Sequence, residues 1–234
     1  MKKLINRISA SSVDQIFIAT HSSLVSTRLD LRKSILLNSN SRYPVTLKDI
    51  PEDTAKFFMK APNNNILEFI LSKKVILVEG DAEFILLEAF YKKCSQSTPD
   101  VDDVHILSVG GTSFKRYLDL AEKLGIKTAV IRDNDGDYNK HCLQRYRDYL
   151  SSDIEVFYDS DNKNETFEIC LYNINKKLCD QIFSSPKRTL PILDYMLKNK
   201  ADSAFKLLDE RADEINIPVY SQFKTKLLWL GQTS

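Results

Sequence analysis

Residues 75–83, VILVEGDAE, pass from a continuous apolar run directly into three carboxylates, and residues 129–137, AVIRDNDGD, also end an apolar run in carboxylates. Each apolar run has the character of a strand that is buried on both faces. Between them, apolar residues recur at helical spacing in 82–94 and 113–125, and a further apolar run, VHILSV, lies at 104–109. The order is therefore strand, helix, strand, helix, strand.

This alternation predicts an α/β fold. Two successive βαβ units are joined by right-handed crossovers, which gives a mostly parallel sheet flanked by helices. Further along, 142–152 and 164–174 have helical patterns, 154–160 reads as a strand, and 191–215 reads as one or two helices. Ligands of such sheets bind beyond the carboxyl ends of the strands, and both acidic clusters fall there.

Four carboxylates form the candidate site. Glu79 ends the first strand and Glu83 lies in the first turn of the next helix, while Gly80 permits a sharp exit that lets both side chains converge. Asp133 and Asp135 alternate at the end of the third strand, so a period of two puts them on the same side. Four neighbouring carboxylates repel one another without a cation, and Mg²⁺ is a hard cation that takes carboxylate ligands.

Single carboxylates at such positions also have ordinary structural roles. Asp and Glu favour helix N-termini and turns, which accounts for any one of the four better than for the whole set. An EF-hand loop starting at Asp133 needs Gly at its sixth position and Glu at its twelfth, where the sequence has Tyr138 and Gln144. The calcium loop is therefore excluded, and Asp137 either lies behind the metal ligands or simply ends the turn.

A glycine pair follows the second strand. Gly110 and Gly111 precede a helix, with Thr112 and Ser113 available as caps. Because a helix N-terminus with such a pair can accept a phosphate, Gly110, Gly111 and Thr112 are candidates for phosphate or DNA binding. A tight turn into a capped helix is the ordinary alternative, and the motif is neither GxGxxG nor a Walker A loop.

The bulk composition narrows the class of protein. The 234 residues suffice for one generous domain, and 33 Lys and Arg against 32 Asp and Glu leave a net charge of +1. That balance argues against a protein that binds nucleic acid by bulk charge, but not against an enzyme with an acidic metal site. The four cysteines lack CxxC spacing, and we find no signal peptide and no apolar run of ~20 residues. We expect reduced thiols, a cytoplasmic location and no membrane segment.

Taken together, VILVEGDAE, SVGGTSF and IRDNDGD resemble the Toprim domain that topoisomerases, primases and certain nucleases share. They are most similar to the C-terminal Toprim domain of the OLD (overcoming lysogenization defect) family of ATP-dependent endonucleases, whose EGxxE form EGDAE matches. The resemblance implies a Rossmann-like Toprim sheet with a C-terminal helical segment. It also implies a divalent-metal-dependent DNA endonuclease, which hydrolyses phosphodiesters and serves in anti-phage defence.

The resemblance implies roles for individual residues. One or two Mg²⁺ or Mn²⁺ ions would be held by Glu79, Glu83, Asp133, Asp135 and Glu168, the last of which lies in NETFEICL. The catalytic residues would be Glu83, Asp133 and Lys200. Lys200 lies in LKNKADSAFKLL, with Lys198 as the second choice, and a solvated surface lysine is the ordinary alternative. A lysine there steadies charge that develops at phosphorus or on the leaving oxygen.

In this family an ABC-type ATPase domain precedes the Toprim domain. QIFIATHSS resembles the last ATPase strand, with His21 as its switch histidine, and RKSILLN resembles the strand after it. A polar residue at a strand end explains His21 equally well. The chain has no Walker A or Walker B motif, so we expect no ATPase activity from it alone, and an ATPase domain or subunit as a partner.

The resemblance divides the chain into four parts. The expected parts are 1–37 as an ATPase remnant, 38–71 as a connecting segment, 72–160 as the Toprim core, and 161–234 as a helical extension that includes a helix from 218 to 229. Within the connecting segment, residues 38–65 are expected to be exposed, with a helix at 52–60. An isolated ATPase remnant exposes apolar surface, which favours association, and the full-length context favours a homo-oligomer. The rival functions are a non-catalytic metal-binding or scaffold subunit that needs an ATPase partner, and another Toprim activity such as that of a topoisomerase or primase.

Overall fold

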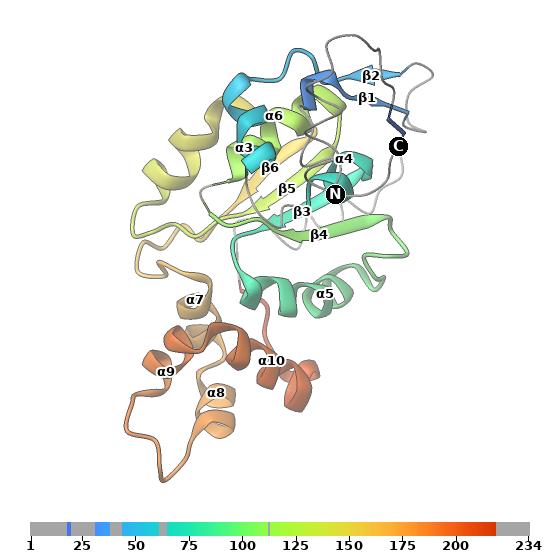
Figure 1. The fold of residues 1–234 in the computed structure, drawn as a ribbon. Coiled ribbons are helices and arrows are strands. Elements are labelled where there is room, and N and C mark those ends of the chain that lie inside the picture. The colour runs from blue at the N-terminus through green and yellow to red at the C-terminus, as the bar shows by residue number, and fades with distance from the viewer. Residues whose placement is uncertain (1–17, 20–30, 38–43, 61–64, 112, 219–234) are drawn as a thin grey trace.

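The computed structural model describes residues 18–19, 31–37, 44–60, 65–111 and 113–218 (Figure 1). A four-stranded parallel sheet lies at the centre of this part. Its strands are β3 (Lys74–Val78), β4 (Val104–Ser108), β5 (Lys127–Ile131) and β6 (Ile154–Phe157), in the spatial order β4-β3-β5-β6. The helices α5 (Asp81–Ser95) and α6 (Phe114–Leu124) make the crossovers. The expected α/β fold is confirmed, and its strand order places the two acidic strand ends side by side.

The sheet separates two hydrophobic cores, and alternate residues of each strand feed one or the other. In β3, Ile76 and Val78 face α5 and the C-terminal helices, whereas Val75 and Leu77 face α3, α4 and α6. This period of two within a continuous apolar run is the pattern of a strand covered on both faces. Figure 1 shows the two helical layers on opposite sides of the sheet.

The segment from 44 to 71 is part of the fold, and the expectation of an exposed connection is wrong for its described residues. It contains the strand β2 (Val45–Thr46), which pairs with β1 (Ile35–Leu36), and the helices α3 (Glu52–Lys60) and α4 (Ile66–Leu71). Phe58 of α3 and Phe69 of α4 are completely buried, and both make edge-to-face contacts with Tyr117. A parallel sheet needs helices on both faces, and these two helices complete the second layer.

Within the described residues, four helices follow β6, and they form the lower lobe in Figure 1. They are α7 (Phe167–Ile174), α8 (Lys176–Phe183), α9 (Ile192–Lys198) and α10 (Lys200–Arg211), followed by a 3-10 turn at Ala212–Glu214. The helix α10 packs along α5. Lys93 of α5 donates hydrogen bonds to the carbonyls of Asp213 and Ile215, at 2.8 and 2.7 Å. The C-terminal helices are thereby fixed to α5.

Several local expectations need correction or were not tested. The helix expected over 142–152 begins earlier, as a π-helix at Asn139–Gln144, and ends in a 3-10 turn at Arg147–Tyr149. His21, Thr112, most of the strand expected at 15–23 and the helix expected from 218 to 229 lie outside the described residues. The described exceptions are Pro218 and residues 18–19, which have no strand conformation. All four cysteines are described, and no disulfide joins them. In the described ranges no helix combines the length and the apolar character that crossing a membrane requires.

Candidate active site

The first acidic segment turns sharply from β3 into α5. Glu79 follows the last strand residue, and Gly80 is the N-cap of α5 in extended conformation. Glu83 lies in the first helical turn with only 5% of its surface exposed. A Cβ atom on Gly80 would lie 3.2 Å from Glu83 Oε2. The carboxylate of Glu83 therefore folds back over Gly80, at the positive end of the α5 dipole.

The second acidic segment is a turn and not the end of a strand. The strand β5 stops at Ile131, and Asp135 and Gly136 have left-handed conformations with φ of 48° and 80°. The amide of Asn134 is buried and donates hydrogen bonds to the carbonyls of Asp159 and Asp161, both at 2.9 Å. Asn134 Oδ1 accepts a hydrogen bond from the Gly136 N–H at 2.9 Å. Asn134 thus fixes the turn to the loop that follows β6.

This turn separates Asp133 from Asp135, so the expectation that a period of two puts both on the same side is wrong. Asp133 Oδ1 accepts a hydrogen bond from the Phe167 N–H at 2.9 Å, at the start of α7. Asp135 instead pairs with Arg132, and its Oδ2 lies 3.9 Å from His141 Nδ1. Strand alternation does not apply here because the backbone leaves the extended region at Asp135.

Asp133 belongs to an inner group, which we define as Glu83, Asp133, Glu168 and Lys200. Glu168 is 3% exposed in the first turn of α7, whose N-cap Thr166 accepts a hydrogen bond from the Ile169 N–H. Lys200, the first residue of α10, places its Nζ 2.9 Å from Glu168 Oε2. Lys198 is exposed at the end of α9. Four different elements therefore supply the inner group.

The electrostatics of the inner group favour a cation. Burial raises the pKa of Glu83 to about 7, with the charges of Glu168 and Glu79 adding to the effect. Burial also raises the pKa of Asp133 to about 8, helped by Glu83 and Glu79. For Lys200, burial acts to lower the pKa, but the hydrogen bond and charge of Glu168 prevail and raise it. Carboxyl groups with such pKa values hold their charge at neutral pH only when positive charge is supplied.

An outer group consists of Glu79, Arg132 and Asp135. The Arg132 guanidinium donates to Glu79 Oε2 through Nη1 and to Asp135 Oδ2 through Nη2. Only 7% of the Arg132 side chain is exposed, against 31% for Glu79 and 43% for Asp135. The sequence analysis missed Arg132, Asn134 and His141. Arg132 could have been recognised as a basic residue that stands directly between an apolar strand and a cluster of carboxylates, where its charge has acidic neighbours.

The glycine pair has a steric explanation. Gly110 has a φ of 75°, a left-handed conformation that disfavours other residues. A Cβ atom on Gly111 would overlap the carboxylate of Glu79, so Gly111 makes room for that side chain. The phosphate-binding role of Gly110 and Gly111 stays a prediction, as does that of Thr112. Asp137 accepts a hydrogen bond from the Lys140 N–H at 3.1 Å and so caps the following helix.

The comparisons with known proteins agree with this geometry. Residues 70–135 match the family model described as Overcoming lysogenization defect protein-like, TOPRIM domain. The chain carries an OLD-like Toprim domain. The matched residues include Glu79, Glu83, Asp133 and Asp135, whereas Glu168 and Lys200 lie beyond them.

Two known proteins are similar over a larger part of the chain. The Old nuclease of Escherichia phage P2 is 25% identical over 150 residues, which cover 60% of this chain and 25% of that protein. The chain thus spans about a quarter of the length of this relative. The C-terminal region of the Burkholderia pseudomallei OLD protein is 18% identical, with a TM-score of 0.52, and the match covers 68% of this chain and 96% of that one. That likeness concerns the fold alone.

The donor set of the candidate site fits Mg²⁺ or Mn²⁺. Five carboxylates offer the hard oxygen ligands that these ions prefer, and two of them have pKa values that a cation would lower. In the described ranges, no three acidic, His or Cys side chains are arranged as a ready group of metal ligands. The ammonium of Lys200 and the guanidinium of Arg132 pair with three of the carboxylates instead.

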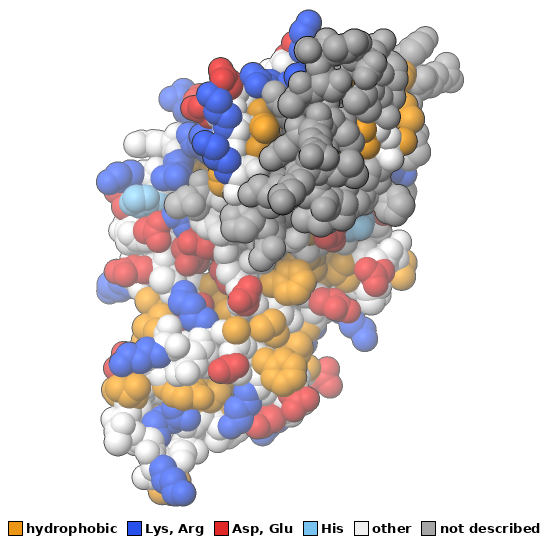
Figure 2. Space-filling model, in the orientation of Figure 1, with side chains coloured by type: hydrophobic (Ala, Val, Ile, Leu, Met, Phe, Trp, Pro, Cys, Tyr) orange, Lys and Arg blue, Asp and Glu red, His pale blue; other side chains and the backbone are white. Residues whose placement is uncertain are grey.

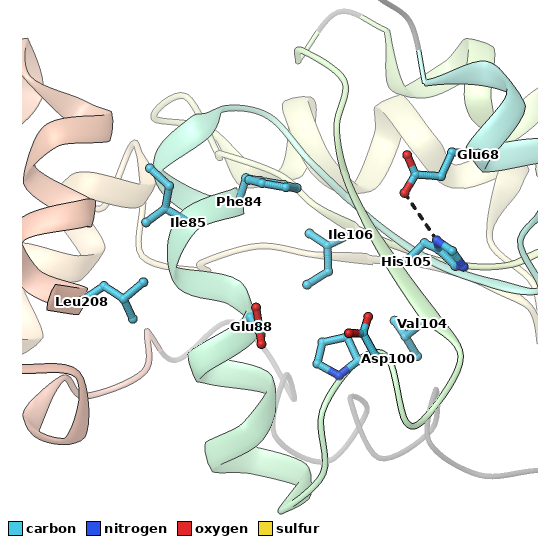
Figure 3. Close-up of a pocket in the computed structure, with 10 residues that line it drawn as sticks. Glu68, Phe84, Ile85, Glu88, Asp100, Val104, His105, Ile106 and Leu208 are labelled. Atoms are coloured by element: carbon cyan, nitrogen blue, oxygen red, sulfur yellow. Dashed lines mark hydrogen bonds and ion pairs between the residues drawn. The ribbon is translucent and has the colours of Figure 1, made fainter. Parts of the chain in front are cut away.

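A cavity of about 410 Å³ lies elsewhere in the chain, between α5, β4 and α10 (Figure 3). Phe84 follows Glu83 in sequence, but Figure 3 shows its ring over this cavity, beside Ile85 and Ile106. His105 and Glu68 form an ion pair of 3.4 Å at its edge. No carboxylate of the inner or outer group lines it, so the cavity is distinct from the acidic site. Figure 2 shows Lys, Arg, Asp and Glu side chains interspersed over the described surface of this face.

Proposed function

We propose that this chain is a divalent-metal-dependent DNA endonuclease that hydrolyses phosphodiester bonds in the cytoplasm and serves in anti-phage defence. The observation that supports this most strongly is the inner group, in which Glu83, Asp133 and Glu168 meet beside Lys200 at the carboxyl ends of parallel strands. The similarity to the Old nuclease agrees with a nuclease. The candidate ligands of Mg²⁺ or Mn²⁺ are Glu79, Glu83, Asp133, Asp135 and Glu168.

The bound metal would supply a Lewis acid and a nucleophilic water at neutral pH. The chain's own residues have separate tasks. Lys200 is half exposed, with 51% of its side chain accessible, so its ammonium can contact a phosphate oxygen or the leaving oxygen. Glu83 is folded back over Gly80 at the start of α5, which places its carboxylate to hold the ion. Asp133 also accepts a hydrogen bond from the Phe167 N–H, which joins the turn after β5 to the start of α7.

The test is nicking of supercoiled plasmid by the purified chain with Mg²⁺, Mn²⁺ or EDTA, beside Asp133→Asn. The Asn variant keeps an oxygen that can accept the Phe167 hydrogen bond while it removes the charge. We expect metal-dependent nicking that the variant loses, with the circular dichroism spectrum unchanged. Asp194→Ala is the matched control, since Asp194 is an exposed carboxylate in the first turn of α9. Nicking by a folded Asp133→Asn variant at the wild-type rate would exclude the proposed site.

We also propose that the nuclease works with an ABC-type ATPase domain or subunit, in a homo-oligomer. The chain spans a quarter of the Old nuclease, and the similar Burkholderia structure is described as a C-terminal region. Ile35 and Leu37, close to the segment similar to the ATPase, are 59% and 84% exposed. Nicking that appears only when an ATPase partner is added would support this proposal. A folded chain that binds Mn²⁺ but nicks no DNA even with that partner would favour the rival function of a non-catalytic subunit.

A further inference from the structure

We propose that this site holds one divalent ion, in the inner group, and that Arg132 is a fixed internal cation where a second ion would otherwise bind. This inference rests on the proposed function and narrows it. It divides the five candidate ligands into two classes. Glu83, Asp133 and Glu168 would contact the ion, whereas Glu79 and Asp135 would be held by Arg132.

The backbone of Arg132 is fixed. It directly follows β5, and its N–H donates a hydrogen bond of 2.9 Å to the carbonyl of Phe157, which extends the pairing of β5 with β6. β5 also pairs with β3, with Val130 opposite Leu77. Arg132 therefore lies across from Glu79, two residues further along both strands. In this register the Arg132 guanidinium faces Glu79, and the strands keep their regular pairing.

The side chain of Arg132 is fixed as well. Its planar fork binds two carboxylates at once, a geometry that a lysine does not reproduce. In the described part of the chain, the buried Nε atom has no hydrogen-bond partner. The contacts with Glu79 and Asp135 thus supply the partners of this cation. A metal ion that took both carboxylates would deprive a buried guanidinium of the two counter-charges that it is hydrogen-bonded to, which is strongly unfavourable.

The charges of the two groups agree with one ion. The outer group has two carboxylates and one guanidinium, so it carries a single negative charge when ionised. The inner group has three carboxylates and one ammonium, which leaves two negative charges. One divalent ion neutralises the inner group. A second ion in the outer group would have to lie beside a guanidinium, and like charges at such short range repel.

Arg132 also positions Glu79 before any metal binds. The Glu79 carboxylate lies over Gly111, where no Cβ would fit, and Arg132 holds it from the other side. Arg132 is accordingly a positioning residue and does not itself need to touch the substrate. Its removal should change the number of ions bound, which a residue with a purely structural role would not do.

The experiment is Mn²⁺ titration of the full chain at pH 8, followed by isothermal calorimetry and by the electron paramagnetic resonance signal of free Mn²⁺. We expect one tight Mn²⁺ in the wild-type chain, two in Arg132→Met, and one in Arg132→Lys, which restores the charge. Two tight ions in the wild-type chain, a single ion in a folded Arg132→Met variant, or no bound ion at all would overturn the proposal.

A second pair of variants applies if Arg132→Met does not fold. Glu168→Gln should weaken Mn²⁺ binding by at least roughly 100-fold, whereas Glu79→Gln should weaken it by roughly 10-fold at most, since Glu79 acts from behind the ligands. Equal losses in both variants would overturn the division into two groups. Plasmid nicking is measured separately. One tight ion without nicking would contradict the proposed nuclease and leave the role of Arg132 standing.

Discussion

Lys200 Nζ lies 2.9 Å from Glu168 Oε2, and this ion pair joins the first residue of α10 to the first turn of α7. The carboxylate is 3% exposed, while half of the lysine side chain reaches solvent. The Lys200 ammonium can therefore neutralise the buried Glu168 carboxylate and also contact a phosphate that enters the site.

We expect Lys200→Ala to lower the rate of metal-dependent nicking by about 100-fold or more, the scale of losing one donor that stabilises transition-state charge. Single-turnover rates at saturating Mg²⁺ measure the effect. Lys198→Ala is the matched control, because Lys198 ends the neighbouring helix and is exposed. A Lys198→Ala variant that loses as much activity as Lys200→Ala would refute the choice between the two lysines.

The stability of the metal-free chain should depend on pH in an unusual direction. The pKa values of Glu83 and Asp133 are about 7 and about 8 in the folded chain, against about 4 in an unfolded one. A raised folded pKa gives a contribution to stability that is complete below about pH 4 and is lost as the pH rises through 7 to 8. In EDTA, the free energy of unfolding should therefore fall between about pH 4 and 8 and level off at higher pH.

Glu83→Gln tests the source of that fall. It removes the buried charge, so at pH 8.5 in EDTA the variant should be more stable than the wild-type chain by about 1–3 kcal/mol, given 1.4 kcal/mol per pKa unit. Urea unfolding at several pH values provides the measurement. A wild-type curve that is flat from about pH 5 to 8, or a Glu83→Gln variant less stable at pH 8.5, would contradict the raised pKa of the Glu83 carboxyl.

The fold was predictable because its strands are apolar on both sides and its helices are amphipathic, so each element can be recognised from the pattern of its own residues. The C-capping position of Gly125, with a φ of 63°, was readable for the same reason. The helix α4 was missed because its six residues are too few to show a period. The helix α8 was missed because the preceding helix runs almost directly into it.

The site was predictable only in its residue types. The carboxylates stand out because they interrupt apolar runs, but which of them share a partner depends on the turn at Asp133–Gly136. That turn is decided by the left-handed backbone of Asp135 and by hydrogen bonds from Asn134 to residues 25 and 27 positions away. Such long-range contacts leave no periodic trace in the sequence. A buried Asn in an acidic stretch reads as an ordinary turn residue.

We expect Asn134 to affect both the stability of the chain and its affinity for metal. Its side chain makes three hydrogen bonds in a buried position, so Asn134→Ala should lower the free energy of unfolding by about 2–4 kcal/mol. It should also weaken Mn²⁺ binding roughly 10-fold, as loss of a residue behind the ligands does. Urea unfolding and Mn²⁺ titration measure the two effects. The control is Asn173→Ala, which removes one exposed hydrogen bond to Asn164, and equal effects of the two changes would refute the prediction.

Gly111 offers a test of the position of Glu79 that leaves every carboxylate in the chain. A Cβ atom there meets the Glu79 side chain and no strained backbone is involved, since Gly111 is not among the glycines with positive φ. We expect Gly111→Ala to push Glu79 off Arg132 and to lower nicking at least roughly 10-fold, because misplacement by about 1 Å costs up to two orders of magnitude.

Gly125→Ala is the matched control: its φ is positive and nothing lies within 4 Å, so it should cost about 1 kcal/mol of stability and leave nicking unchanged. Nicking and urea unfolding of both variants separate the two effects. Full nicking by Gly111→Ala would mean that Glu79 tolerates displacement, and that its place between Gly111 and Arg132 does not matter for cleavage.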